Sequence, residues 1–207
     1  MDSGSRYPMF DPSRIHTYPV AERRNKVRID DLVSCDVVRN THYEVGPAAD
    51  AVEQVAAAVA EARSKDRPVI IFTGAHLIKN GLSPLLMDLV RRRLVTLVAT
   101  NGAGAIHDFE LALIGETSEN VPHALGKGKF GMAYEFAYFN RAIAEGQTRG
   151  WGLGESLGAT ICRADFRAAV ERRSDLVEAV DFQFPQHSLL VRCYQLAVPL
   201  TVHVGIG

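Results

Sequence analysis

Two short apolar runs constrain the fold of this chain more than any other feature. Val69–Thr73 and Leu94–Thr100 are continuous and rich in β-branched residues, as is typical of strands buried on both faces. Each run is followed by a loop and then by a pattern typical of a helix. A strand that leads through a short joint to a helix, and then to the next strand, favours a parallel sheet with right-handed crossovers. The sequence therefore predicts an α/β fold: a Rossmann-like parallel sheet with helices on both faces.

Helical patterns surround these two strands. Residues 48–63 carry valine and alanine at helical spacing, and we expect this stripe to pack on one face. Ser83 as a cap and Pro84 at the first position predict a helix that runs to Arg92. We expect a loop at 74–81, further helices at about 105–114, 118–124 and 132–145, two or three helices without a strand between 150 and 197, and a third strand at 200–204.

The first 47 residues differ in composition from the rest and predict an irregular arm, 1–47, with one short element near 27–38. We expect this arm to pack on the main domain or on a neighbouring subunit. Its basic run Arg23–Lys26 is typical of a solvated loop, with a contact to phosphate or to a partner as the alternative. Residues 48–207 are expected to form a single domain. Because the sequence stops at Gly205-Ile206-Gly207, directly after the third predicted strand, we expect that domain to be incomplete at its C-terminus.

Composition excludes several classes of protein. Hydrophobic residues make up 47% and charged residues 23% of the 207, which is average globular usage, and the net charge of -1 gives no global attraction to nucleic acid or to anionic membrane. No apolar run is long enough to span a bilayer, and no secretory leader pattern opens the chain. The three cysteines form no C-x-x-C pair and are expected to be reduced. We therefore expect a cytoplasmic protein without a nucleic-acid or membrane partner.

In an open parallel sheet, ligands bind beyond the carboxyl ends of the strands. The sequence places three loops there, at 74–76, 101–108 and 205–207. The second loop is the most informative, because Gly102 and Gly104 let the backbone come close to a ligand while the next helix points its free N–H groups at the same place. The pyrophosphate of a dinucleotide suits this arrangement, although His107 stands where the dinucleotide fingerprint has its third glycine.

Polar side chains gather at the same strand ends. His76 and His107 lie beside glycines, where an imidazole is available for proton transfer or ligand contact. Asp108 and Glu110 open the next helix, where carboxylates also compensate the helix dipole. His203 lies inside a predicted strand and is expected to be a satisfied core residue. An alternative function uses the same residues: His76, His107 and Asp108 could bind a divalent metal in a hydrolase, although no metal-ligand signature supports it.

Around these loops the chain resembles the deoxyhypusine synthase family. The stretch Phe72–Ser83, with Thr73-Gly74-Ala75-His76 at its start, stands where that family has a strand, a Thr/Ser-Ser-Asn type loop, an aliphatic pair and a glycine before a helix. Val98–Asp108 stands where the family's next strand ends in a Thr-Thr-Ala-Gly-Gly turn followed by acidic residues. The last strand, Val198–Gly205, resembles the one that leads into the family's next cofactor loop.

The resemblance implies an NAD-binding Rossmann-like fold in a homo-oligomer, a tetramer. It also implies a reaction in which NAD takes hydride from spermidine before the aminobutyl group passes to a protein lysine, so that a small amine and an acceptor protein are the expected partners. His76 and His107 would be the catalytic residues. Carried over by position, the cofactor-binding residues would be Gly74, Ala75, His76, Thr100, Asn101, Gly102, Ala103, Gly104 and Asp108.

The chain also departs from the family. His76 stands where the family has asparagine, and His107 where it has an acid that contacts NAD. The family's imine-forming lysine lies in a later segment, and Lys79, Lys127 and Lys129 match no such motif. These departures indicate a divergent branch with another substrate. A third alternative is a catalytically silent relative that only binds a ligand or pairs with a complete subunit.

Overall fold

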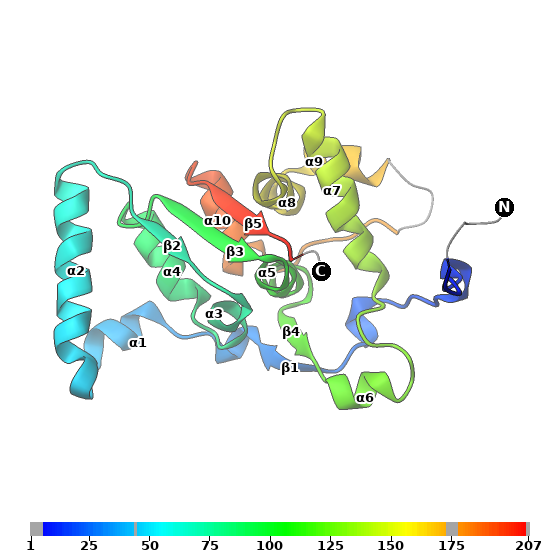
Figure 1. Cartoon of the computed structure of the whole chain (residues 1–207), viewed down its shortest axis with the longest axis horizontal. Helices are drawn as coiled ribbons and strands as arrows, with labels where there is room; N and C mark the ends of the chain where they lie inside the picture. The colour runs from blue at the N-terminus through cyan, green and yellow to red at the C-terminus, as the bar shows by residue number, and fades with distance from the viewer. Residues whose placement is uncertain (1–5, 44, 173–177, 206–207) are drawn as a thin grey trace.

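A three-stranded parallel sheet forms the centre of the computed structural model, which describes residues 6–43, 45–172 and 178–205. Helices flank this sheet (Figure 1). In the order β2–β3–β5 its strands are β2 (Ile70–Phe72), β3 (Leu97–Asn101) and β5 (Leu200–His203). The mixed α/β class and the three predicted strands are confirmed. The second strand begins at Leu97 rather than Leu94, because the amide of Leu94 still donates to Leu89 in the turn that ends the preceding helix.

One face of the sheet carries the hydrophobic core. Val98 and Leu200 occupy neighbouring positions on this face and are almost fully buried. They pack against α5 (Gly102–Ile114), α8 (Leu153–Cys162) and α10 (Leu189–Gln195). Strand alternation places successive side chains on opposite faces, so these residues and their neighbours fix which face of the sheet is buried.

The opposite face of the sheet is open. Ile70 is 48% exposed and Phe72 is 79% exposed, although both belong to a strand expected to be buried on both faces. The predicted helix 48–63 is α2 (Ala49–Ser64), but it lies to one side of the sheet (Figure 1), and Val55 of its apolar stripe is 65% exposed. Within the described ranges, helices therefore cover one face of the sheet and not both.

Hydrogen bonds from the Arg63 side chain to backbone carbonyls hold the end of α2 beside the sheet. The Arg63 guanidinium donates to the carbonyl of Arg93 at 2.8 Å and to the carbonyl of Arg67 at 2.5 Å. Asp66, in the turn between α2 and β2, has a φ of 52°, a conformation that L-residues seldom adopt. These contacts direct the helix along the sheet edge, so its valine stripe does not reach the open face.

Two helix starts differ from the prediction. The segment expected to be a loop contains α3 (Ala75–Lys79), a single short helix. The next helix, α4 (Ser83–Arg91), is preceded by Leu82 at its cap position, so Ser83 is not the cap. Ser83 is fully buried and lies inside the first turn, next to Pro84.

An antiparallel pair replaces part of a predicted helix. Residues 118–124 were expected to be helical with Ser118 as the cap, but Ser118 belongs to β4 (Glu116–Glu119), which pairs with β1 (Asn25–Arg28). The helix α6 (Val121–Leu125) begins only after Asn120. The Asn25 and Glu116 side chains that meet across this pair are 91 positions apart, so no local pattern indicates the strand.

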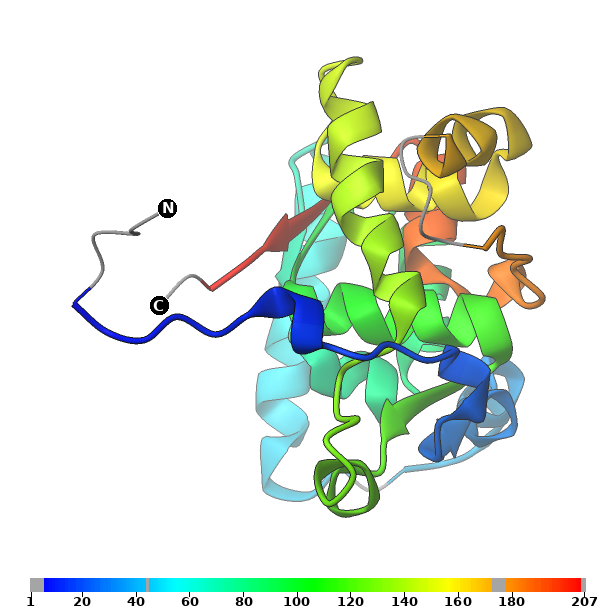
Figure 2. The same ribbon diagram turned by 90° about the vertical axis from the view of Figure 1, so that its right-hand side faces the viewer.

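The N-terminal arm packs on the main body. The short element expected near 27–38 consists of β1 and of α1 (Cys35–Asn40). Tyr18 forms a parallel bridge with Ala133, and the arm runs across the face of the molecule that Figure 2 presents. Among the described residues, no helix is long and apolar enough to cross a membrane. The remaining α-helices are α7 (Ala137–Gln147) and α9 (Ala164–Glu171). The described residues of the region 150–197 thus contain three α-helices, α8, α9 and α10, and no strand, as predicted.

Candidate functional site

The three parallel strands end at one edge, around an open hollow of about 380 Å³. Three of the residues predicted to bind a cofactor, Gly74, Thr100 and Asn101, are brought together in its wall. The third predicted loop lies partly outside the described residues, which end at Gly205. Of the described residues, the wall contains Phe72, Thr73, Gly74, Ala99, Thr100, Asn101 and His203.

Asn101 connects the two main loops of this hollow. It is the N-cap of α5, and its side-chain oxygen accepts the amide hydrogen of Gly104 at 2.8 Å. Its amide nitrogen lies 3.5 Å from the position that a β-carbon on Gly74 would take. The predicted cofactor turn is therefore the capped first turn of a helix, in which Gly102 and Ala103 are the first two residues.

The two glycines of this turn have different surroundings. A β-carbon on Gly104 would overlap the hydroxyl of Thr100, so the protein itself excludes a side chain there. A β-carbon on Gly102 would meet only Cγ2 of Val204, at 4.0 Å. The described residues therefore leave the space at Gly102 unfilled, and a ligand can approach the backbone at this point, which follows Asn101 of the wall.

Thr100 borders the hollow, but its hydroxyl is buried and has no partner among the described residues. It is 6% exposed, and its hydroxyl makes no hydrogen bond within the described part of the chain. Most buried hydroxyls are paired, because an unpaired one loses its hydration without compensation. The Thr100 hydroxyl lies under Gly104, on the same face of β3 as Val98, so it is buried in the protein and does not face the hollow.

The electrostatics of the hollow favour an anion. The first turn of α5 leaves backbone N–H groups without intrahelical acceptors, and the positive pole of the helix dipole lies at the same end. His203 is the titratable residue in the wall, and its Nε2 lies 2.9 Å from Oγ1 of Thr201. The prediction that His203 is a core residue is wrong: it is exposed, because its face of the sheet is uncovered.

His107 faces away from the hollow, toward β4. Its Nδ1 lies 2.7 Å from Oγ1 of Thr117, which also donates to the buried carboxylate of Glu110. Glu110 pairs with the arm through Arg23 at 2.7 Å. Burial alone would raise the pKa of Glu110, but hydrogen bonds from His107 and Thr117 and the charge of Arg23 hold that pKa below its ordinary value. This network fastens the arm to α5.

Asp108 lies in the core and caps another helix. Its carboxylate accepts hydrogen bonds from the Ser188 hydroxyl at 2.5 Å and from the amides of Leu189 and Leu190 at 2.7 and 3.0 Å. Burial raises the pKa of Asp108 to about 6, against the opposing effect of these donors. Its two oxygens are thus engaged by the start of α10, and Asp108 does not line the hollow at the strand ends.

The candidate cluster of His76, His107 and Asp108 is not assembled. His76 is exposed on α3, next to the half-buried Ala75, and lines no part of the hollow. His107 and Asp108 point to β4 and α10 as described above. Within residues 6–43, 45–172 and 178–205, no three His, Cys, Asp or Glu side chains gather in a way that could hold a metal ion. The metal-dependent hydrolase therefore lacks a ligand set in the part of the chain that the structure describes.

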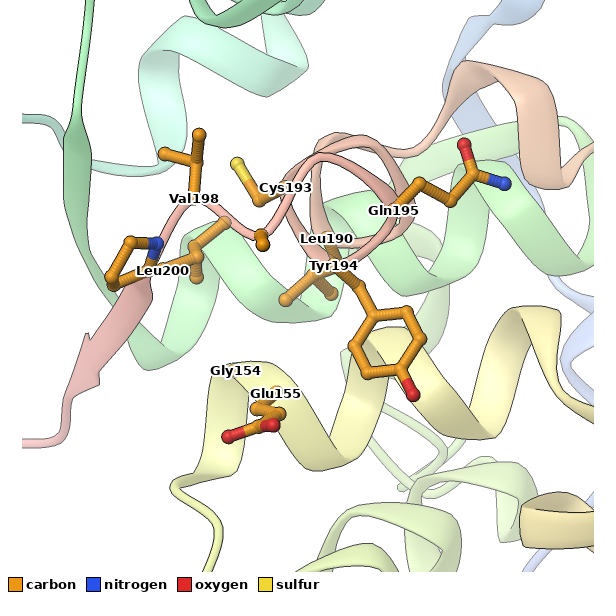
Figure 3. A pocket seen from close by; sticks show the side chains of 10 residues that line it. Gly154, Glu155, Leu190, Cys193, Tyr194, Gln195, Val198 and Leu200 are labelled. Carbon is orange, nitrogen blue, oxygen red and sulfur yellow. The ribbon is translucent and has the colours of Figure 1, made fainter.

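A second hollow, of about 520 Å³, lies at the opposite end of β5 (Figure 3). Figure 3 shows Leu190 and Cys193 on α10 and Leu200 at the entry to β5. Burial raises the pKa of the Cys193 thiol to about 12, so the thiolate, the nucleophilic form, is scarce near neutral pH. This hollow offers apolar volume but no activated nucleophile.

Sequence reasoning missed four residues of the described wall as site residues: Phe72, Thr73, Ala99 and His203. Phe72 was interpreted as the end of a buried strand and His203 as part of the core. The available signal was strand alternation, which places both on the face opposite Val98. That face is accessible because no helix of the described residues covers it, which is a tertiary feature.

No protein-family model matches the chain, and no curated protein matches it in sequence. Among solved structures, the chain is similar to the apo form of ArgZ, an arginine dihydrolase from the ornithine–ammonia cycle in cyanobacteria. The TM-score is 0.44 and the sequence identity 19%, over 77% of this chain and 18% of the ArgZ chain. The chain thus spans less than a fifth of that protein, and a likeness at this score carries no argument about function.

These comparisons correct the family prediction. No family model supports the resemblance to deoxyhypusine synthases, and the solved structure named above is an arginine dihydrolase. The prediction of a deoxyhypusine synthase-like, spermidine-dependent transferase is therefore wrong, because that prediction depended on the family resemblance alone. NAD binding, the homo-oligomer, the small amine partner and the cytoplasmic location stay predictions.

Proposed function

We propose that the carboxyl edge of the β2–β3–β5 sheet binds a phosphate-bearing ligand of the nucleotide class, and that NAD is the first such ligand to test. The observation that carries this proposal is the capped start of α5 at the end of β3, with open space at Gly102. A helix start of this kind presents backbone N–H groups and the positive end of the helix dipole to an anion.

The apolar side of the hollow suits a planar ring. Phe72 is 79% exposed in its wall, and Ala99 forms part of the sheet beneath. Aromatic rings stack face to face with an offset, so Phe72 can contact an adenine or nicotinamide ring while the phosphate lies at α5. The volume of about 380 Å³ lies near the lower end of the range for ligand pockets and suits one nucleotide half of NAD better than the whole molecule.

The finer fold assignment belongs to the same proposal. A Rossmann-like site has a third glycine where this chain has His107, and a large residue there would crowd the helix against its strand. The His107 imidazole instead points to Thr117 on β4, at 2.7 Å. This orientation supports a dinucleotide-type turn without the third glycine.

The described wall favours ligand binding over catalysis. It contains no carboxylate, and His203 is its one titratable residue among those described. His76, His107 and Asp108, the residues expected to act in proton transfer or to bind a metal, lie outside the wall. We therefore propose a protein that binds its ligand without turnover by this site alone, which keeps the ligand binding of the third alternative above but not its family.

Calorimetric titration with NAD, ADP and adenosine tests this proposal. We expect saturable binding of NAD and ADP and at least tenfold weaker binding of adenosine, because adenosine lacks the phosphate. Asn101→Ala should weaken ADP binding without unfolding the chain, since an exposed cap contributes about 1 kcal/mol to stability. Equal affinities for ADP and adenosine, or no binding of any of the three, would contradict the proposal.

A further inference from the structure

A second cluster of polar groups lies between the N-terminal arm and the turn that follows α6. Arg24, His123, Lys127 and Lys129 border a hollow of about 80 Å³. The hollow is too small for a sugar or a base and has room for one compact anion. It shares no residue with the hollow at the strand ends.

Backbone contacts bring these cationic residues together from separate segments. The amide of Asn120 donates to the carbonyl of Arg24 at 2.8 Å, which places the basic run of the arm beside the start of α6. The amide of Lys129 donates to the carbonyl of Ala124 at 3.0 Å, so the following turn folds back on α6. Gly128, with a φ of 64°, makes this reversal possible.

The positive charges of this cluster are not compensated by ion pairs. Among the described residues, Arg24, Lys127 and Lys129 form no salt bridge. Lys127 Nζ lies 3.3 Å from Nε2 of His123, and Lys129 Nζ lies 4.7 Å from the centre of the Tyr18 ring. The charges of Lys127 and then of Arg24 lower the pKa of His123, because both cations border the same hollow as its imidazole.

The acidic residues at the hollow do not neutralise it. The charge of Glu119 is offset by Arg23 of the same wall, at 3.7 Å, and its carboxylate also accepts hydrogen bonds from the Tyr18 hydroxyl and the Gly131 amide, both at 3.0 Å. Glu22 is exposed and remains the one uncommitted carboxylate in the described wall. Arg24, Lys127 and Lys129 thus share the hollow with one unpaired carboxylate among the described residues, that of Glu22.

A larger hollow, of about 510 Å³, adjoins the small one and shares Tyr18, Lys127 and Lys129 with it. Its other wall includes apolar side chains of the arm: Phe10 is 65% exposed and Ile15 is 41% exposed. The turn at 127–129 therefore separates a cationic hollow from a mainly apolar one.

We propose that this region binds a small phosphate monoester, with the phosphate at Lys127 and Lys129 and the organic body against Phe10 and Ile15. A phosphate group carries nearly two negative charges and three strong acceptor oxygens at neutral pH, and lysine and arginine are its usual partners. Lysine binds as a point charge on a flexible stem, so Lys127 and Lys129 can close on the anion from two sides.

The test uses phenyl phosphate and inorganic phosphate as probes, titrated into the full chain at constant ionic strength. We expect phenyl phosphate to bind saturably and more tightly than inorganic phosphate. Lys127→Gln should weaken both probes at least fivefold, whereas Lys26→Gln, which removes the same charge from the arm outside either hollow, should leave both unchanged. Phe10→Ala should weaken phenyl phosphate alone.

Three results would overturn the assignment. The first is that phenyl phosphate does not bind saturably. The second is an equal loss in the Lys127→Gln and Lys26→Gln variants, which would indicate general electrostatic attraction. The third is equal affinity for the two probes, which would exclude a contact between the organic body and the arm.

In the bound state the pKa of His123, followed by NMR, should rise, because the anion offsets the charges of Lys127 and Arg24.

Discussion

Asp108 and Ser188 lie 80 positions apart in the sequence and form a 2.5 Å hydrogen bond in the core. The same carboxylate accepts the amide hydrogens of Leu189 and Leu190. The helix that begins at the end of β3 thereby caps the helix that leads into β5. This connection fixes α5, whose first turn forms one side of the proposed ligand site, against the rest of the core.

The Asp108 carboxylate should give the protein an unusual pH dependence. Its pKa is about 6 in the folded state against 3.8 in an unfolded chain, so the folded state holds this proton more tightly. Its contribution to the free energy of unfolding is therefore present below about pH 4 and is lost as the pH rises through about 6. Between these limits we expect the loss to be on the order of 2–3 kcal/mol.

Denaturant titrations of wild type and Asp108→Asn at several pH values measure this effect. The asparagine variant should be less stable at every pH, because its NH₂ group meets buried N–H donors. The stability difference between the two proteins should narrow from pH 4 to pH 6.5. A difference that widens over this range would mean that the hydrogen bonds outweigh burial.

Glu110 should give the free energy of unfolding a pH dependence opposite to that from Asp108. Its pKa is held below the ordinary value of 4.5, so its contribution to stability is present above that value and is lost as the pH falls through the folded pKa. Glu110→Gln removes the nearer counter-ion of the buried Arg23 and leaves it only Glu119, at 3.7 Å, so we expect a cost of up to about 3–5 kcal/mol. Thermal unfolding at pH 7 should show a large drop in Tm, and the variant should lose part of the wild type's acid sensitivity. A change under 1 kcal/mol would contradict the described pairing.

The contact between Gly104 and Thr100 predicts a strong coupling. Gly104→Ala should lower the free energy of unfolding by about 1–3 kcal/mol, because the new methyl group overlaps the Thr100 hydroxyl. Thr100→Ala removes that hydroxyl, so the double variant should recover much of the loss. Gly126→Ala, at a position with open space around it, is the matched control and should be nearly neutral. Additive losses in the double variant would argue against the contact.

Phe72 should affect binding far more than stability. Because its side chain is 79% exposed, Phe72→Ala should change the free energy of unfolding by less than about 0.5 kcal/mol. Loss of a stacked ring should nevertheless weaken ADP binding by about threefold to tenfold. Calorimetry and denaturant unfolding on the same preparation separate the two effects. An unchanged affinity would place the base elsewhere.

Local patterns were sufficient to predict the parallel sheet. The strands at 70–72 and 97–101 are continuous apolar runs, and each is followed closely by a helix. The approach of Gly74, Thr100 and Asn101 to one another follows from this pattern, because parallel strands end at a common edge.

Contacts distant in sequence could not be predicted in the same way. The partner of Asp108 is the start of α10, and the partner of His107 is Thr117 on a strand that exists only because the arm pairs with it. A carboxylate in a first helical turn gives no sign of which helix it caps. For the same reason the open face at Phe72 was missed, since an apolar strand residue has the same pattern whether or not a helix covers it.

The central claim is that a phosphate-bearing ligand lies at the first turn of α5, and Gly102 offers the most direct test. Among the described residues, the nearest atom that a β-carbon at Gly102 would meet is Cγ2 of Val204, at 4.0 Å, so Gly102→Ala should fold normally while its methyl group occupies the space of the ligand. Calorimetric titration of ADP into Gly102→Ala and into Gly126→Ala compares this change with the same change at an open surface position. We predict at least tenfold weaker binding for Gly102→Ala and wild-type affinity for Gly126→Ala. Wild-type affinity in both variants would contradict the proposed site.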